Sequence, residues 1–208
     1  MSTLEVYFEF SSPYAYFASE RVEAECGRLG LEVEWRPIVL GPILRRTGQR
    51  PLLTDGARGR YARADCVRWA RLHDIPFRLP ALHPVNSLKA ARGALVLKHA
   101  GLGAGAMSPL LAAYIHACFS AYWVEGKDLF QDEVLGDLVA GLGMAVQAFQ
   151  ARIAAPEAKE RLRRETDAAW ERGVFGAPTF FYRDEMLWGN DRLPLLERLV
   201  QENRARAS

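Results

Sequence analysis

The turn F-S-S-P constrains this chain more than any other feature, because it joins a strand to a helix with almost no loop between them. Residues 4–10 alternate in character and are rich in β-forming side chains, which is typical of a strand. Ser12 is a preferred N-cap residue, and Pro13 suits the first helical position, where its missing N–H removes no hydrogen bond. We therefore expect a helix over residues 13–28.

A second strand is expected at residues 31–38, which read L-E-V-E-W-R-P-I and alternate apolar with charged side chains. A strand, a helix and a strand in this order favour a parallel pair. After Leu40 the chain changes character: we expect a basic loop at residues 45–48 and then, for over a hundred residues, only helices. Their predicted ranges are 61–73, 87–99, 109–124, 132–142 and 156–172.

Strand character returns near the carboxyl end, at residues 178–183 and 186–188. Asp184-Glu185 lies between them as a two-residue hairpin connection. A last helix is expected at 193–203, followed by a frayed tail. The predicted order is βαβ, a block of helices, then ββα. This is an α/β fold in which residues 1–39 and 160–208 form a discontinuous domain, and residues 40–159 form an inserted all-helical domain.

Composition excludes several classes of function. The 208 residues include 27 basic and 25 acidic side chains, and the resulting net charge of +2 gives no electrostatic reason to expect nucleic-acid binding. No apolar run reaches the ~18 residues of a membrane span, and the first residues do not resemble a signal peptide, so we expect a cytoplasmic protein that does not bind membranes. The three cysteines are widely spaced and should be buried, and the four histidines show no metal-ligand spacing.

Ser12 has two possible roles. The simpler one is an N-cap, whose hydroxyl oxygen accepts a free backbone N–H of the helix. The other follows from the same geometry, because the N–H groups and the positive dipole end of the helix face the space beyond the carboxyl end of the strand. Open α/β sheets commonly bind ligands there, and an anion would be stabilised.

The βαβ-ββα order resembles the thioredoxin fold, and a helical insertion after its second strand resembles the DsbA-like branch. Redox members of that branch carry C-x-x-C where this chain has Ser12-Pro13-Tyr14-Ala15, so disulfide exchange by the protein alone is excluded. The chain is similar, over essentially its whole length, to the 2-hydroxychromene-2-carboxylate isomerases and to the kappa-class glutathione transferases. The similar stretches are F-E-F-S-S-P-Y-A-Y (8–16), R-W-A-R-L-H-D-I-P-F (68–77), H-P-V-N-S (83–87), Y-W-V-E-G-K-D (122–128), F-G-A-P-T-F-F (175–181) and L-W-G-N-D-R-L (187–193).

This resemblance implies glutathione as cofactor. It implies that Ser12 contacts the thiol, with Ser11 as a nearby donor, and that the backbone of Ala177, before a cis Pro178, pairs with the cysteinyl unit. The γ-glutamyl end is expected at residues 188–192, where Asp191 would meet the ammonium group. The predicted residues of this segment are Trp188, Asn190, Asp191 and Arg192. Alternatively, Asn190 or Asp191 is only an N-cap.

The second substrate implied by the resemblance is a small aromatic carboxylate. Its site needs apolar walls and one or two cations. Candidate walls are Tyr14, Phe17, Tyr122 and Trp123, and candidate partners of the carboxylate and neighbouring polar atoms are Arg45, Arg46, Asn86 and Lys89. Aromatic residues at helical spacing are also typical of a core, and basic residues are typical of a solvated surface.

The resemblance further implies a reaction, the conversion of 2-hydroxychromene-2-carboxylate to trans-o-hydroxybenzylidenepyruvate with recovery of glutathione, and a homodimer. Two other functions stay open. A kappa-type transferase or peroxidase would share the glutathione site, and a thioredoxin-like scaffold that only binds a partner protein would use Ser12 as a cap and nothing more.

Overall fold

Four strands form one mixed sheet in the computed structural model, which describes residues 2–100 and 109–207. The strands are β1 (Ser2–Phe8), β2 (Leu31–Pro37), β3 (Thr179–Tyr182) and β4 (Glu185–Trp188), in the order β2-β1-β3-β4. β1 pairs with β2 in parallel and with β3 antiparallel, and β4 runs antiparallel to β3 at the edge. This topology confirms the thioredoxin-type α/β fold.

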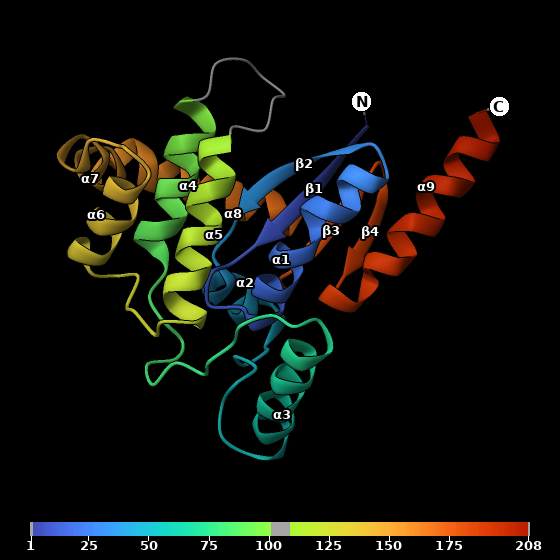
Figure 1. Cartoon of the computed structure of the whole chain (residues 1–208), viewed down its shortest axis with the longest axis horizontal. Coiled ribbons are helices and arrows are strands. Elements are labelled where there is room, and N and C mark those ends of the chain that lie inside the picture. Colours follow the sequence, from blue (N-terminus) through green and yellow to red (C-terminus); the bar gives the residue numbers. More distant parts are fainter. Residues whose placement is uncertain (1, 101–108, 208) are drawn as a thin grey trace.

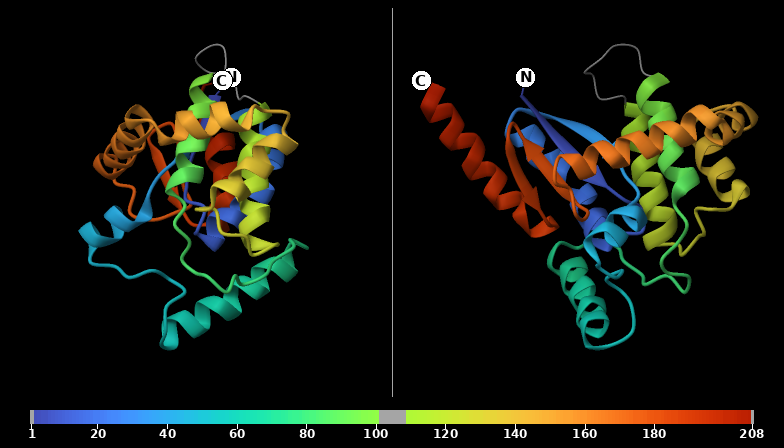
Figure 2. Two further views of the ribbon diagram at one scale, coloured as in Figure 1. Left: turned by 90° about the vertical axis from the view of Figure 1, so that its left-hand side faces the viewer. Right: turned by 180° about the vertical axis from the view of Figure 1, so that it is seen from behind.

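Helices cover both faces of the sheet. Helix α1 (Pro13–Arg28) lies in front of it in Figure 1, with α9 (Leu193–Ala207) beside β4, and α8 (Pro156–Glu171) crosses the other face, which Figure 2 shows from behind. Successive side chains of β1 point to opposite faces of the sheet, so alternate residues pack against the helices on each side. Val6 belongs to the large core shared with α1 and α9, whereas Tyr7 packs in the smaller cluster that includes Ala169 of α8.

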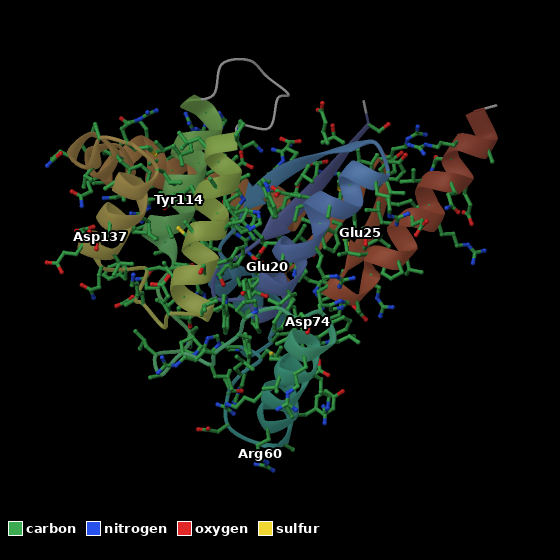
Figure 3. The ribbon with its side chains drawn as sticks, viewed as in Figure 1. Glu20, Glu25, Arg60, Asp74, Tyr114 and Asp137 are labelled. Atoms are coloured by element: carbon green, nitrogen blue, oxygen red, sulfur yellow. The ribbon has the colours of Figure 1, made fainter. Side chains whose placement is uncertain are left out.

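Between β2 and β3 the described residues form helices joined by loops, as expected. Before α8 these helices are α2 (Leu40–Thr47), α3 (Ala57–Leu72), α4 (Leu88–Ala100), α5 (Pro109–Trp123), α6 (Asp132–Gly141) and α7 (Val146–Ala154). Helix α5 packs on α1, α4 and α6 pack on α5, and α7 packs on α4 and α6, while α3 projects below the sheet in Figure 1. Figure 3 labels Tyr114 inside this block, where its hydroxyl donates to Ala90 O at 3.2 Å. The proposed domain boundary at 159/160 falls within α8, and the division itself stays a prediction.

The local conformation at the start of α1 is the one that the sequence indicates. Ser12 is extended at φ −89° and ψ 115°, its Oγ accepts from Ala15 N, and Pro13 opens the helix. The backbone N–H of Ser12 donates to Glu9 O at 3.0 Å, which closes the turn after β1. The amino end of α1 therefore lies at the carboxyl end of β1.

Two helices differ from the sequence prediction. The expected basic loop at 45–48 is the end of α2, which begins at Leu40 and tolerates Pro42 because a proline in the first turn breaks no hydrogen bond. This helix ends at Gly48, whose φ of 69° suits a left-handed C-cap. Helix α7 was not predicted, because its nine residues lie between Gly143 and Pro156, where the sequence favours a connection.

The carboxyl end also differs in two details. Tyr182 pairs with Glu185, so the hairpin turn is Arg183-Asp184 and not Asp184-Glu185. Arg183 has a φ of 56°, which the turn requires and which the sequence does not indicate. The tail predicted to fray continues α9 to Ala207, and the guanidinium of Arg204 donates to Leu29 O at 2.6 Å. Ser208 lies outside the described residues.

The three cysteines are buried and free, as predicted, and burial raises the pKa of each thiol to about 12. They behave as small core side chains and not as nucleophiles. None of the helices described within residues 2–100 and 109–207 has the length and apolar character that crossing a membrane requires.

Candidate active site

A cleft of about 560 Å³ opens at the amino end of α1. The turn after β1 and Tyr14 form one side, and the start of α2 with the loop that follows it forms another. The segment before α4, the residues just before β3 and Trp188 of β4 complete the wall. The lining segments are 9 and 11–14, 39–42 with 44–45, 49–52 with 58, 83–88, 175–177 and Trp188.

Ser12 and Ala177 meet in this cleft although 165 residues separate them. The Ser12 hydroxyl donates to Ala177 O at 2.8 Å, and Ser12 Oγ also accepts the Ala15 N–H at 3.2 Å. The peptide between Ala177 and Pro178 is cis. Ser12 is 6% exposed, so its hydroxyl faces little bulk water. The predicted cap is therefore confirmed, and the capping oxygen lies where a helix dipole favours an anion.

The backbone of Ala177 can pair with a peptide-like ligand. Within the described residues, its N–H donates to no protein acceptor, and its carbonyl, which accepts from Ser12, retains a second lone pair. The next carbonyl is already used, because Pro178 O accepts from Gly189 N at 3.0 Å. One donor and one acceptor are thus presented by a single residue beside the amino end of α1.

Trp188 extends the cleft toward the carboxyl-terminal helix. Its indole is 49% exposed and lies against Phe175, with ring centroids 4.7 Å apart. Gly176 makes this packing possible, because a Cβ at that position would lie 2.5 Å from Trp188 Nε1. The wall formed by the indole would therefore move if residue 176 had a side chain.

Residues 190–192 form a 3₁₀ turn that contacts α1 and does not line the cleft itself. Asn190 is 3% exposed, and its Nδ2 is buried without a hydrogen-bond partner among the described residues. Asp191 and Arg192 are exposed, and Arg192 Nη2 lies 3.4 Å from Asp191 Oδ2. No side-chain cap bond is formed at the start of this turn, so the predicted alternative role of Asn190 or Asp191 as a cap is not observed.

The predicted substrate residues divide into two groups. Tyr14, Arg45 and Asn86 line the cleft. Tyr14 contributes its ring, because its hydroxyl donates to Asp65 Oδ2 at 2.7 Å, and Asn86 Oδ1 accepts from Leu88 N at the start of α4. Lys89 does not line the cleft.

The other predicted residues have structural partners elsewhere. Lys89 Nζ lies 2.8 Å from Asp132 Oδ1 and over the ring of Phe130, and Arg46 pairs with Asp167 at 2.7 Å. The three remaining aromatic candidates are fully buried core residues and not cleft walls: Phe17, Tyr122 and Trp123. Their helical spacing indicated a core as well as a wall, and the core interpretation is the one observed.

Several lining residues were missed by the sequence analysis. Arg50 and Arg58 bring two more cations to the cleft, and they lie in a loop and a helix start that give no periodic signal. Glu9 is 4% exposed, and its only sequence signal is a charged residue between two phenylalanines at a buried strand end. Ser87 donates its hydroxyl to Glu9 Oε1.

His83 also lines the cleft. Its Nδ1 lies 2.8 Å from the Tyr122 hydroxyl, which itself donates to Leu82 O at 3.0 Å, so His83 carries its proton on Nδ1. Burial lowers the pKa of His83 to about 4, and the imidazole is therefore neutral at pH 7. Among the described residues, no cluster of three histidine, cysteine or acidic side chains could hold a metal ion.

Comparison with known proteins gives a consistent picture. The family model of the DSBA-like thioredoxin domain matches residues 3–201. The 2-hydroxychromene-2-carboxylate isomerase of Pseudomonas putida is 37% identical over 209 residues, covering 96% of this chain and 97% of its own. A solved structure of 2-hydroxychromene-2-carboxylate isomerase, 32% identical, gives a TM-score of 0.82 and covers 99% of this chain and 100% of its own. Human glutathione S-transferase kappa 1 is 26% identical, covering 96% of this chain and 91% of its own.

Proposed function

Because the chain belongs to the 2-hydroxychromene-2-carboxylate isomerase family of DsbA-like thioredoxin-fold proteins, we propose that it is a glutathione-dependent isomerase. The proposed reaction interconverts 2-hydroxychromene-2-carboxylate and trans-o-hydroxybenzylidenepyruvate. One observation carries the proposal: the Ser12 hydroxyl lies at the amino end of α1, beside the cis peptide at Pro178, in a cleft whose lining contains no cysteine among the residues that the structure describes. A site of this geometry without its own sulfur suits a ligand that brings a thiol.

The residues of the cleft fit glutathione, a tripeptide with one thiol and two carboxylates. Ser12 would meet the thiol, with Ser11 as its neighbour in the cleft, and the free N–H and the carbonyl of Ala177 would pair with the cysteinyl backbone. Trp188 would support the ligand along the way to residues 190–192, where the Asp191 carboxylate suits an ammonium group and the buried Asn190 amide lacks a partner. Bound glutathione would supply a thiolate that adds reversibly to the substrate.

Ser12 would contribute by stabilising that thiolate. A thiol with a pKa of ~8.5 is only about 3% ionised at pH 7. A hydroxyl hydrogen bond to the anion, together with the helix dipole, contributes roughly 1–3 kcal/mol, which lowers the thiol pKa by about one to two units. For this, the Ser12 hydroxyl must turn its hydrogen from Ala177 O to the sulfur, while its oxygen continues to cap α1.

The second substrate would occupy the half of the cleft between α2 and the segment before α4. Its apolar walls come from Pro42, Leu44 and Val85, which suit an aromatic ring. Arg45 lines this half and makes no ion pair within the described residues, so we propose it for the substrate carboxylate, with Asn86 beside it. Lys89 is a weaker choice, because Asp132 already neutralises it outside the cleft.

An equilibration assay tests this function. The purified protein is mixed with either compound, with and without glutathione, and the absorbance is followed from both sides of the equilibrium. We expect both directions to converge on one mixture and to require glutathione. Arg45→Gln is expected to raise KM for the substrate by about tenfold, whereas Arg68→Gln, on the exposed face of α3, leaves it unchanged. Absence of turnover in either direction contradicts the proposal.

A transferase or peroxidase is the second candidate, favoured by the kappa-class relative that covers 96% of this chain. It would use the same glutathione site and release a conjugate or reduce a peroxide. Activity with chlorodinitrobenzene or cumene hydroperoxide, and none with the hydroxychromene, supports it. Failure to bind glutathione at millimolar concentration supports the scaffold instead. The homodimer and the cytoplasmic location stay predictions.

A further inference from the structure

A buried carboxyl group, that of Glu9, lines the cleft beside the two serines. Glu9 follows the last residue of β1 and is 4% exposed. Its Oε2 accepts from the backbone N–H of Ser11 at 3.0 Å and from the Ser11 hydroxyl, and its Oε1 accepts from the Ser87 hydroxyl. No arginine, lysine or histidine forms an ion pair with it within the described residues.

The charges around Glu9 leave it without a compensating cation. Tyr122 of α5 interacts electrostatically with Glu9, and His83, bonded to Tyr122, is neutral at pH 7. Arg45, Arg50 and Arg58 line the same cleft, but none of them is among the groups that influence the pKa of Glu9. Burial raises the pKa of Glu9 above its usual value near 4.5, and the hydrogen bonds from Ser11 and Ser87 oppose this only in part. The protonated form is thus more accessible here than on a surface.

Protonation of Glu9 changes what Ser11 offers to the cleft. An ionised carboxylate only accepts, so it takes the hydroxyl hydrogens of both serines. A protonated carboxyl has one O–H, and if that hydrogen is on Oε2 it can be given to Ser11 Oγ. The hydrogen of Ser11 is then free to turn toward the cleft. Ser11 is half-buried and lines the cleft, whereas Ser87 is 7% exposed, so Ser11 is the more open route.

We propose that Glu9 is a positioning residue that stores one proton and exchanges it with the substrate through the hydroxyl of Ser11. This inference rests on the proposed isomerase function and adds a residue to it. Ser12 serves the thiol, and the pair of Glu9 and Ser11 serves the substrate oxygen. The two neighbouring serines thus have different tasks.

The proton balance of such a relay closes. When the thiolate of glutathione adds to the carbon–carbon double bond of the ring-opened keto acid, that bond's electron pair moves toward the conjugated carbonyl oxygen. Ser11 gives its hydrogen to that oxygen and takes the carboxyl hydrogen of Glu9, which becomes ionised. After rotation about the bond, which is now single, the same steps run in reverse. Glu9 regains its proton, the double bond re-forms, and the thiolate leaves.

Glu9→Gln is the decisive variant, because its amide keeps one donor and one acceptor for the two serines but cannot release a proton. We expect kcat to fall by about 10²- to 10⁴-fold. The KM for glutathione should change by less than about twofold, and the pKa of the bound thiol by no more than a few tenths of a unit. In wild type, kcat should fall toward high pH as Glu9 loses its proton. In Glu9→Gln this fall should be absent. Glu23→Gln, which removes a carboxylate bound to His116 outside the cleft, is the matched control and keeps the profile.

A second readout uses the protein without substrate. With ¹³C-labelled glutamate carboxyl groups, wild type is expected to show one resonance that titrates above the usual range and that Glu9→Gln lacks. If Glu9→Gln does not fold, Ser11→Ala should lose kcat and Ser11→Thr should recover most of it. A Glu9→Gln or Ser11→Ala enzyme with wild-type kcat and pH profile overturns the inference alone. A wild type that binds glutathione without isomerising the substrate overturns the proposed function as well.

Discussion

Ser12 joins the stability of the fold to its proposed chemistry within a single side chain. Its oxygen caps α1 by accepting from Ala15 N, and its hydrogen reaches Ala177 O on a segment 165 residues away. The sequence could predict the cap, because Ser-Pro at a strand end is a local signal. It could not predict the partner Ala177 without the resemblance, since nothing local links the two positions. Glu9 was missed for the same reason, because its partner Ser87 is 78 residues away.

Replacement of Ser12 should therefore cost stability as well as activity. We expect Ser12→Ala to lower the free energy of unfolding by about 1–2 kcal/mol, because the cap is lost and Ala177 O loses its donor. Urea denaturation followed by circular dichroism measures this. Ser19→Ala is the matched control: Ser19 is a buried serine of the same helix whose hydroxyl only donates to Tyr16 O, and we expect a change under about 0.5 kcal/mol. Equal losses in the two variants contradict the assignment of a cap.

At the scale of elements, periodic helices were predictable and short ones were not. Helix α1 begins and ends where the spacing predicts, because it has a cap, a proline and a regular apolar face. Helix α2 has a proline in its first turn and two arginines in its last, so its sequence shows no regular apolar face. In the structure the buried side chain of Ile43 anchors this helix. The predicted hairpin turn is displaced by one residue, because Tyr182 of β3 pairs with Glu185 of β4 and the turn is therefore Arg183-Asp184.

The contact between α1 and α5 is expected to depend on pH. His116 of α5 lies between two acids of α1, with Nε2 3.1 Å from Glu23 and Nδ1 3.6 Å from Glu20, which Figure 3 labels on that helix. The carboxylates of Glu20 and Glu23, of which Glu23 is hydrogen-bonded to the ring, raise the pKa of His116 to about 9. A pKa that is raised on folding stabilises the folded state fully below the unfolded value near 6.5 and loses its effect as the pH passes about 9.

His116→Gln tests this directly. The difference in free energy of unfolding between wild type and variant should be largest at pH 5–6.5 and should shrink between about pH 6.5 and 9. Because the histidine side chain is 33% exposed, added salt should reduce the difference. Urea denaturation across this range measures it. A difference that does not change with pH shows that the three side chains do not act as an ion pair.

A single hydrophobic core extends across the boundary between the sheet and the helical block. One continuous cluster of buried side chains contains Val6 of β1, Val22 of α1, Phe119 of α5 and Leu196 of α9. The indole of Trp123 donates to Phe10 O at 2.9 Å and ties α5 to the turn that carries Ser12. The cleft is thus built on the junction of the two regions, which explains why its lining residues come from both.

This continuity predicts cooperative unfolding. We expect far-ultraviolet circular dichroism and tryptophan fluorescence to report one coincident urea transition, because neither region keeps a complete core without the other. Trp123→Phe, which leaves Phe10 O without its donor, should lower the midpoint of both signals together. Two separated transitions contradict the shared core and favour independent domains.

Calorimetric titration of glutathione into wild type and Ser12→Ala tests whether Ser12 activates a thiol that a ligand brings. In both complexes the thiolate absorbance near ~240 nm is followed against pH. We expect both proteins to bind, wild type to lower the thiol pKa by about one to two units, and Ser12→Ala to leave it at about 8.5. Equal thiol pKa values in the two complexes, or no binding by either protein, contradict this role of Ser12.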